Sequence, residues 1–202
     1  MANIDLDSLT GIWRRESLTI EQGDSFEDSA VYWLQDGDFF ADMRWPLRPG
    51  ETNLSTVSAF AGRTHWTPPK IEFHHHIDID PQDSKDEGVL TIVNGKLWEH
   101  GEATLEGRSI KFKEQWMPLH ATNQSRSTKT TVVDTADEIG YLVQVDNYAI
   151  GMNKTRGAFS AACLKRSTTK ESWHLLQLIG DIRQLHPLIK AHRIRLMQEK
   201  DL

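Results

Sequence analysis

The chain has 202 residues, a single cysteine and a formal net charge of −6. An acidic chain repels phosphate backbones and anionic lipid surfaces, so we expect neither nucleic acid nor a membrane as a partner. One cysteine excludes an intramolecular disulfide, and no segment approaches the roughly 20 apolar residues that a membrane-spanning helix needs.

The N-terminal segment does not look like a signal peptide. Residues 1–11 carry acidic side chains and no basic one, and no apolar run follows them. A lone cysteine, Cys163, is typical of a reducing compartment. Together these features predict an intracellular, cytoplasmic protein.

Short segments of alternating apolar and polar residues fill the chain up to residue 166 and predict β-strands. They lie at Ile12–Ile20, Ala30–Gln35, Phe39–Trp45, Val57–Gly62, Lys70–Asp80, Gly88–Val93, Lys96–Glu102, Ser109–Trp116, Thr128–Val133, Ile139–Ile150 and Ala158–Lys165. Asp36-Gly37 and Asn94-Gly95 are two-residue hairpin turns. The pattern predicts a mainly β fold, a single antiparallel barrel of about ten strands over residues 1–166.

After Arg166 the pattern becomes that of a helix. Residues 168–171 fit a capping box. Apolar side chains then recur at helical spacing, at Leu175, Leu178, Ile179, Ile182 and Leu185. Pro187 should end or kink this helix, and residues 188–197 can form a second one. We therefore expect residues 167–202 to be a tail of one or two helices, packed on the barrel or on a partner in a homodimer.

The start of the first predicted strand resembles that of the calycins, the superfamily of lipocalins and fatty-acid-binding proteins. Gly11 and Trp13 match the Gly-x-Trp motif of that family, in which the tryptophan closes the barrel floor against an arginine ending the last strand. Arg166 stands at the matching place. The resemblance implies a lipocalin-like barrel around a small molecule, with Gly11, Trp13 and Arg166 as structural floor residues. A guanidinium over an indole gains about 1 kcal/mol.

A second resemblance concerns the strand Phe39–Trp45. Its run Phe40-Ala41-Asp42-Met43-Arg44 is similar to the Asp-Tyr-Arg strand of phenolic acid decarboxylases, which are cytosolic barrels that bind a substrate acid. The first predicted strand lacks the tyrosine pair of those enzymes. This resemblance motivates a cofactor-free lyase or isomerase as an alternative function.

Single polar residues on apolar strand faces are the candidate site residues. His75 is the only polar residue on a face of Lys70–Asp80 that otherwise holds Ile71, Phe73, Ile77 and Ile79. That face should point into the barrel. The opposite face should lie in solvent and holds Glu72, His74, His76, Asp78 and Asp80. His74 and His76 could hold a metal ion with Glu72 or Asp78 as a third ligand, but an ordinary polar strand face is expected here and the metal question stays open. A buried His75 can also simply satisfy hydrogen bonds.

Glu114 is in a similar position, among large apolar side chains of the strand Ser109–Trp116. A buried carboxylate needs a partner, and the candidates are His75, Arg15 and Arg44. A carboxylate and an imidazole in one apolar cavity can orient a polar ligand or act as acid and base.

These features predict an intracellular barrel that binds a partly aromatic or acidic small molecule. Since tryptophan suits cavity walls, the expected ligand-binding residues are Arg15, Trp33, Trp98, Glu99, Trp116 and Tyr148. In the lyase or isomerase alternative the catalytic residues are His75, Glu114 and Arg44. A third alternative is an interaction module acting through the C-terminal helices. No cofactor or metal is expected. The identity of the ligand and the inward face of Lys96–Glu102 stay open.

Overall fold

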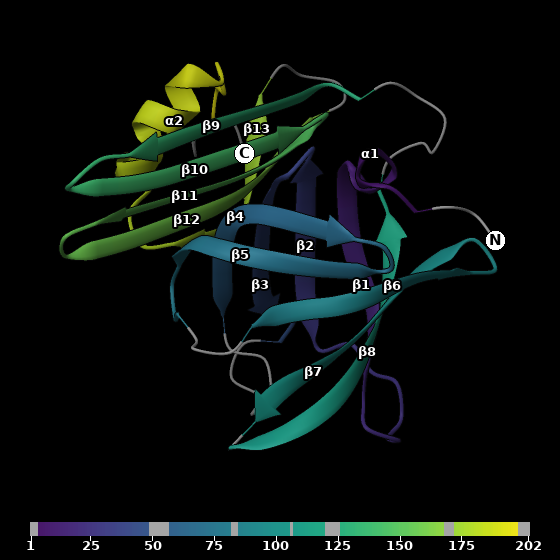
Figure 1. Cartoon of the computed structure of the whole chain (residues 1–202). Coiled ribbons are helices and arrows are strands. Elements are labelled where there is room, and N and C mark those ends of the chain that lie inside the picture. Colours follow the sequence, from purple (N-terminus) through teal and green to yellow (C-terminus); the bar gives the residue numbers. More distant parts are fainter. Residues whose placement is uncertain are drawn as a thin grey trace.

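The computed structural model describes residues 4–48, 57–81, 85–105, 107–119, 126–167 and 172–197. Eight antiparallel strands form a closed barrel, in which β8 pairs back onto β1. They are β1 (Gly11–Ile20), β2 (Ser29–Asp36), β3 (Phe39–Pro46), β4 (Ser58–Thr67), β5 (Lys70–Asp78), β6 (Asp86–Val93), β7 (Lys96–Leu105) and β8 (Arg108–Pro118). A short helix, α1 (Leu6–Leu9), precedes β1 and packs at one end of the barrel (Figure 1). The mainly β class and the antiparallel barrel are confirmed.

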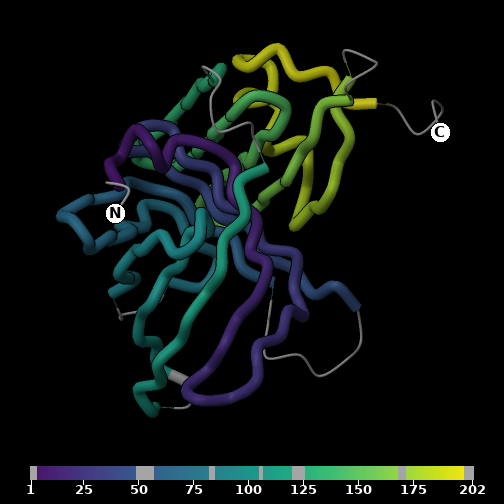
Figure 2. The backbone as a smooth tube through the Cα atoms, turned by 90° about the vertical axis from the view of Figure 1, so that its right-hand side faces the viewer, coloured from purple at the N-terminus to yellow at the C-terminus, as the bar shows by residue number. Residues whose placement is uncertain are grey.

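Five more strands form a second sheet beside the barrel, in the order β13-β12-β11-β10-β9. They are β9 (Thr128–Asp134), β10 (Glu138–Val145), β11 (Tyr148–Thr155), β12 (Ala158–Arg166) and β13 (Trp173–Ile179). Figure 2 shows this sheet, in green to yellow, standing to one side of the barrel strands. The barrel therefore has eight strands rather than about ten, because the predicted strands after residue 128 belong to this sheet.

Three apolar clusters hold the layers together. The barrel interior is packed from Leu9, Trp13, Val31, Trp33, Phe40, Ile71 and their neighbours. A second cluster joins the outer wall of the barrel to the second sheet, with residues such as Leu34, Met43, Val143 and Ile150. The third lies between the far face of that sheet and the C-terminal helices, and includes Leu142, Leu164, Leu188 and Ile189. The second sheet is thus covered on both faces.

The helix expected after residue 167 is wrong over its first half, because Trp173–Ile179 is strand β13, paired with β12. Leu176 and Ile179 contact the barrel-side cluster, whereas Trp173 and Leu178 contact the helix-side cluster. A strand that is buried on both faces carries apolar residues on both, and their combined spacing imitates a helix. The predicted capping box at residues 168–171 lies outside the described residues.

The helical part of the C-terminal segment is short. Within the described part of that segment it consists of a 3-10 turn at Ile182–Leu185 and of α2 (His186–Ala191). Pro187 lies in the first turn of α2, where its missing N–H leaves no hydrogen bond unmade, so it starts a helix rather than ending one. Among the described residues no helix is long and apolar enough to cross a membrane.

Two further predictions need correction. Ile139–Ile150 is not one strand but the hairpin of β10 and β11, with Asp146 at the turn at a φ of 50°. Arg166 ends β12 of the second sheet, and its guanidinium lies 5.8 Å from the ring centroid of Trp173. The predicted pair of Trp13 with Arg166 is therefore wrong, because the strand that Arg166 ends is not part of the barrel.

Trp13 nevertheless packs at the barrel end that α1 covers. Its indole Nε1 donates a hydrogen bond of 2.7 Å to the carbonyl oxygen of Leu9, and its ring stacks on Trp33 at 5.8 Å between centroids. Gly11 starts β1 and is buried. The tryptophan of the Gly-x-Trp segment thus helps to close the barrel, but with partners from α1 and β2.

A β-bulge in β5 changes which side chains face inward. The register against β4 shifts at Gly62, and His76 is the extra residue. A Cβ on Gly62 would lie only 1.9 Å from the carbonyl oxygen of His74, so this close approach requires glycine. Beyond the bulge Ile77 packs outward against the second sheet, whereas Asp78 faces the barrel interior. The predicted alternation along this strand is therefore wrong after His75.

Candidate functional site

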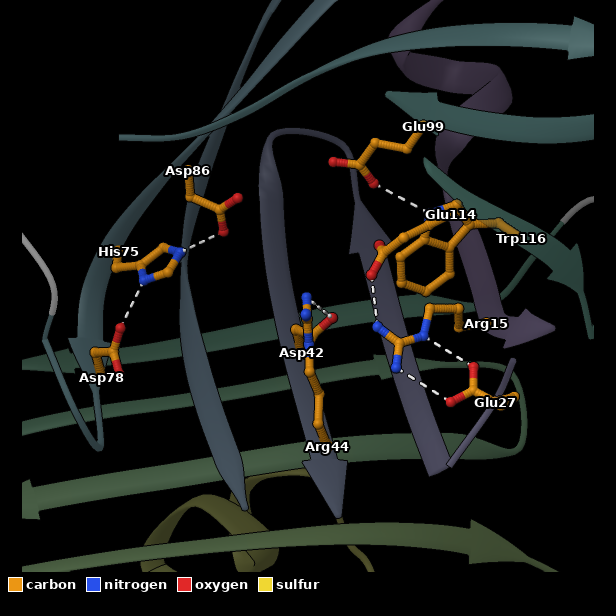
Figure 3. Close-up of polar contacts among 10 residues, drawn as sticks. All are labelled: Arg15, Glu27, Asp42, Arg44, His75, Asp78, Asp86, Glu99, Glu114 and Trp116. Atoms are coloured by element: carbon orange, nitrogen blue, oxygen red, sulfur yellow. Dashed lines mark hydrogen bonds and ion pairs between the residues drawn. The ribbon is translucent and has the colours of Figure 1, made fainter. Parts of the chain in front are cut away.

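The barrel contains a partly open cavity of about 800 Å³. Its aromatic wall lies toward the end covered by α1 and consists of Trp33, Phe40, Phe60, Phe73 and Trp116. Its opposite end is lined by apolar side chains from the far ends of β1 and β8, namely Leu18, Ile20, Ile110 and Phe112. Charged side chains form a belt between these two regions (Figure 3). The belt consists of Arg15, Asp42, Arg44, His75, Asp78, Asp86, Glu99 and Glu114.

Arg15 joins two carboxylates in this belt. Its Nη1 donates to Glu114 at 2.5 Å, and its Nε and Nη2 donate to the two oxygens of Glu27 at 2.8 and 3.1 Å. Arg15 and Glu114 are each 5% exposed. Burial alone lowers the pKa of Arg15, but Glu114 and Glu27 raise it above its usual value. Arg15, Glu27 and Glu114 therefore form a buried network of charge-assisted hydrogen bonds.

Arg44 forms a second ion pair within β3. Its Nε and Nη2 donate to the two oxygens of Asp42 at 2.7 and 3.2 Å. The two residues are two positions apart and so project from the same face of the strand. The guanidinium also lies 5.2 Å from the ring centroid of Phe60. Burial lowers the pKa of Arg44, while Asp42 and Glu114 raise it, with a net rise.

His75 is held between two aspartates. Its Nδ1 lies 2.7 Å from Asp78 and its Nε2 lies 2.9 Å from Asp86, and its ring stacks on Phe60 at 4.2 Å. Burial lowers the pKa of His75, but these hydrogen bonds outweigh it and bring the pKa to about 9. His75 is therefore an imidazolium at neutral pH, with both N–H groups engaged. It links β5 to β6 beyond Phe73, where their ladder ends.

Glu99 differs from the other acids of the belt. It is 4% exposed, and its Oε2 accepts a hydrogen bond of 3.0 Å from the indole Nε1 of Trp116. Among the described residues no cation pairs with it, and no hydrogen bond reaches its Oε1. It lies directly opposite Glu114 in the β7–β8 register. Burial first, and then Glu114 and Asp86, raise the pKa of Glu99 well above its usual value, so it holds its proton to higher pH than an ordinary glutamate.

Glycines make room for this arrangement. A Cβ on Gly88 would lie 2.6 Å from Oε1 of Glu99, and one on Gly101 would lie 2.4 Å from the Phe112 ring. Both glycines stand in neighbouring strands whose side chains would otherwise fill the barrel.

Seven of the residues expected at the site line this one cavity: Arg15, Trp33, Arg44, His75, Glu99, Glu114 and Trp116. Two expected ligand-binding residues do not. Trp98 alternates with Glu99 and faces outward, with Lys113 Nζ 4.0 Å from its ring centroid. Tyr148 packs between the barrel and the second sheet, where it stacks on Tyr32.

Sequence reasoning missed the acids that pair with the cations: Glu27, Asp42, Asp78 and Asp86. The spacing of Asp42 and Arg44 was a usable signal, since residues two apart in a strand share a face. The bulge hid Asp78, and no strand pattern marked Glu27 or Asp86.

The three consecutive histidines point in different directions. His74 lies 3.5 Å from Glu72 on the outside, His75 faces the cavity, and His76 bonds the hydroxyl of Tyr141 in the second sheet. Within the described ranges, no group of three His, Cys, Asp or Glu side chains is arranged to hold a metal ion.

Comparison with known proteins gives two matches. The model of a family described as Protein HRI1 matches residues 11–201. The crystal structure of uncharacterized protein YLR301w from Saccharomyces cerevisiae is similar, with a TM-score of 0.66 over 84% of this chain and 85% of that chain. Its sequence identity of 15% means that the likeness shows the fold alone. None of the curated proteins matches the sequence.

Proposed function

We propose that this chain, which belongs to the family described as Protein HRI1, binds a small molecule inside its barrel. One observation carries the proposal: an aromatic cavity of about 800 Å³ is ringed by buried charged side chains. Its volume lies within the range of roughly 300–1,000 Å³ that small-molecule sites occupy. The calycin resemblance, which implies an enclosed ligand, supports the same function.

The energetics of the belt favour a binding role. Eight-stranded barrels can be filled by their own side chains, and apolar residues would stabilise such a core better than buried ion pairs do. Here Arg15, Arg44 and His75 each take one or two carboxylates out of water around an open space. Fixed charges beside aromatic walls can orient a polar ligand, and this role would account for their burial.

Native mass spectrometry of the purified protein tests this function. We expect a mass excess that disappears on denaturation. Ser58→Trp places an indole in the cavity and should abolish that excess. His65→Trp adds the same ring to an exposed position of the same strand and should retain it. A native mass equal to the denatured mass for each of the three proteins, together with no binding in a screen of small aromatic compounds, would contradict a cavity function.

A second candidate function is a cofactor-free lyase or isomerase, as the decarboxylase resemblance implies. The favouring observation is the cross-strand pair of Glu99 and Glu114. Burial raises the pKa of Glu99, whereas Glu114 is ion-paired with Arg15. Two carboxyl groups in unlike environments are the usual arrangement of an acid and a base. His75 fits the role of base less well than expected, because both of its nitrogens are engaged by aspartates.

Isotope exchange separates the two functions. A ligand retained by the protein is incubated with it in deuterated water and weighed by mass spectrometry. An enzyme of this kind incorporates deuterium, and Glu114→Gln stops the exchange while the ligand stays bound. A binding protein leaves the ligand unlabelled, and Glu114→Gln changes its affinity only.

A further inference from the structure

We infer, on the basis of the proposed function, that the ligand carries a protonated amine on an aromatic or aliphatic body, and that Glu99 is the counter-ion of this amine. The inference adds a ligand class to the binding function. It draws on the charge of the cavity, on the contacts of Glu99 and on the character of the walls.

The cavity has an excess of acids. Apart from Glu72, which lies on the outside with His74, the described residues that line it include the seven carboxyl side chains Asp42, Asp78, Asp80, Asp86, Glu99, Glu102 and Glu114. The cations among them are Arg15, Arg44, Lys85 and Lys154, with the imidazolium of His75 besides. Seven acids therefore face five cations, and an excess of one acid remains when Glu99 holds its proton. An anionic ligand would add to this excess, whereas a cationic one reduces it.

Glu99 is the acid in this cavity that is set up to receive a cation. Its neighbour Glu114 is ion-paired with Arg15, whereas Glu99 accepts a single hydrogen bond, from an uncharged indole. Glu99 is 4% exposed and borders the cavity, and the described residues donate no hydrogen bond to its Oε1, which packs against Gly88. An ammonium group at the Glu99 carboxylate would form a charge-assisted hydrogen bond that no described residue supplies.

The walls fit the rest of such a molecule. Trp33, Phe40, Phe73 and Trp116 border the same cavity as Glu99, and the faces of aromatic rings attract cations. Toward the opposite end, Leu18, Ile20, Ile110 and Phe112 offer an apolar surface for a ring or chain. Acid, aromatic faces and apolar surface together suit an amphipathic amine.

Binding should release a proton. Without a bound cation, burial and neighbouring acids raise the pKa of Glu99, so the side chain keeps its proton to higher pH than an ordinary glutamate. A bound ammonium favours the carboxylate and lowers that pKa. An amine ligand therefore displaces the Glu99 proton into solvent, whereas a neutral ligand of the same shape does not.

Three indoles of matched shape test the inference: tryptamine, the neutral tryptophol and the anionic indole-3-propionate. Calorimetry at pH 6 in two buffers of different ionisation enthalpy gives affinity and proton release together. We expect tryptamine to bind at least tenfold more tightly than either analogue and to release up to one proton. Octylamine, octanol and octanoate repeat the comparison on an aliphatic body.

Matched variants assign the effect to one residue. Glu99→Gln keeps the shape of the protonated acid and should fold normally, as circular dichroism verifies. It should weaken tryptamine at least tenfold, leave tryptophol within threefold and abolish proton release. Asp137→Asn makes the same acid-to-amide change at an exposed ion pair of the second sheet and should alter none of these values.

Two results would overturn the inference without touching the binding function. One is tighter binding of the anionic members, which would point to Arg44. The other is an amine preference that Glu99→Gln leaves unchanged. If no probe of either scaffold binds, the amine inference fails, and the native mass measurement then decides independently whether the cavity holds a ligand of another class.

Discussion

Glu99→Gln should make the stability of the ligand-free protein less sensitive to pH. The folded protein holds the Glu99 proton more strongly than the unfolded chain does, because burial and the nearby Glu114 and Asp86 raise the pKa of Glu99 in the fold. In the unfolded chain the pKa is that of an ordinary glutamate, about 4.3. Between these two pKa values the unfolded state loses its proton first, so the contribution of Glu99 to stability falls as pH rises.

The magnitude follows from one proton. Each pH unit inside that window costs the wild type about 1.4 kcal/mol of unfolding free energy relative to Glu99→Gln, which has no proton to lose. Urea denaturation of ligand-free protein, followed by tryptophan fluorescence at pH 5, 6, 7 and 8, measures the difference. The unfolding free energy of Glu99→Gln should rise relative to that of the wild type with increasing pH, until the pH passes the raised pKa of Glu99. The unfolding free energy of Asp137→Asn should keep a constant difference from that of the wild type.

A difference between Glu99→Gln and wild type that stays constant within about 0.5 kcal/mol from pH 5 to 8, which is near the error of such extrapolations, would refute this reasoning. It would mean that Glu99 is ionised in the folded protein. Another group of the folded protein would then have to stabilise the Glu99 carboxylate. Glu99 would no longer be available as the counter-ion of a ligand.

Three further predictions concern the barrel. Trp13→Ala should cost about 3–5 kcal/mol in urea denaturation, the usual range for a buried tryptophan, whereas Trp98→Ala on the outer face should cost about 1 kcal/mol or less. Arg15→Met should cost about 3–5 kcal/mol because it leaves a buried carboxylate unpaired, and adding Glu114→Gln should recover part of that loss; an additive double variant would contradict the contact. His75, with a pKa raised to about 9, should stabilise the fold fully below about pH 6.5 and lose up to about 3 kcal/mol of that effect as pH rises to 9. The stability difference between wild type and His75→Gln in melting curves should therefore narrow over this range. A difference independent of pH would show that the fold does not raise the pKa of His75.

Local pattern in the sequence predicted the strands of the barrel well. Each of them overlaps a predicted segment, since alternation and turn chemistry are set by neighbouring residues. Asn94 and Gly95 have the positive φ angles, 53° and 76°, that their hairpin turn requires. Glu114 and His75 face inward as expected, because the alternation of inward and outward side chains is undisturbed along each strand up to these residues.

What the sequence could not predict depends on pairing between distant strands. Nothing local assigns β10 to a second sheet rather than to the barrel, because both surroundings bury apolar side chains. The face of β7 was open because Glu99 and His100 are equally polar, and only the register with β8 turns Glu99 inward. One extra residue, His76, reverses the alternation of β5 and brings Asp78 to the site.

A crystal structure of the protein grown with tryptamine tests most directly whether the cavity is a ligand site. We predict the indole in the cavity against the aromatic side chains of Trp33 and Trp116, with its ammonium group within hydrogen-bonding distance of the Glu99 carboxylate. Tryptamine found only on the outer surface, with water alone in the cavity at saturating concentration, would contradict the account.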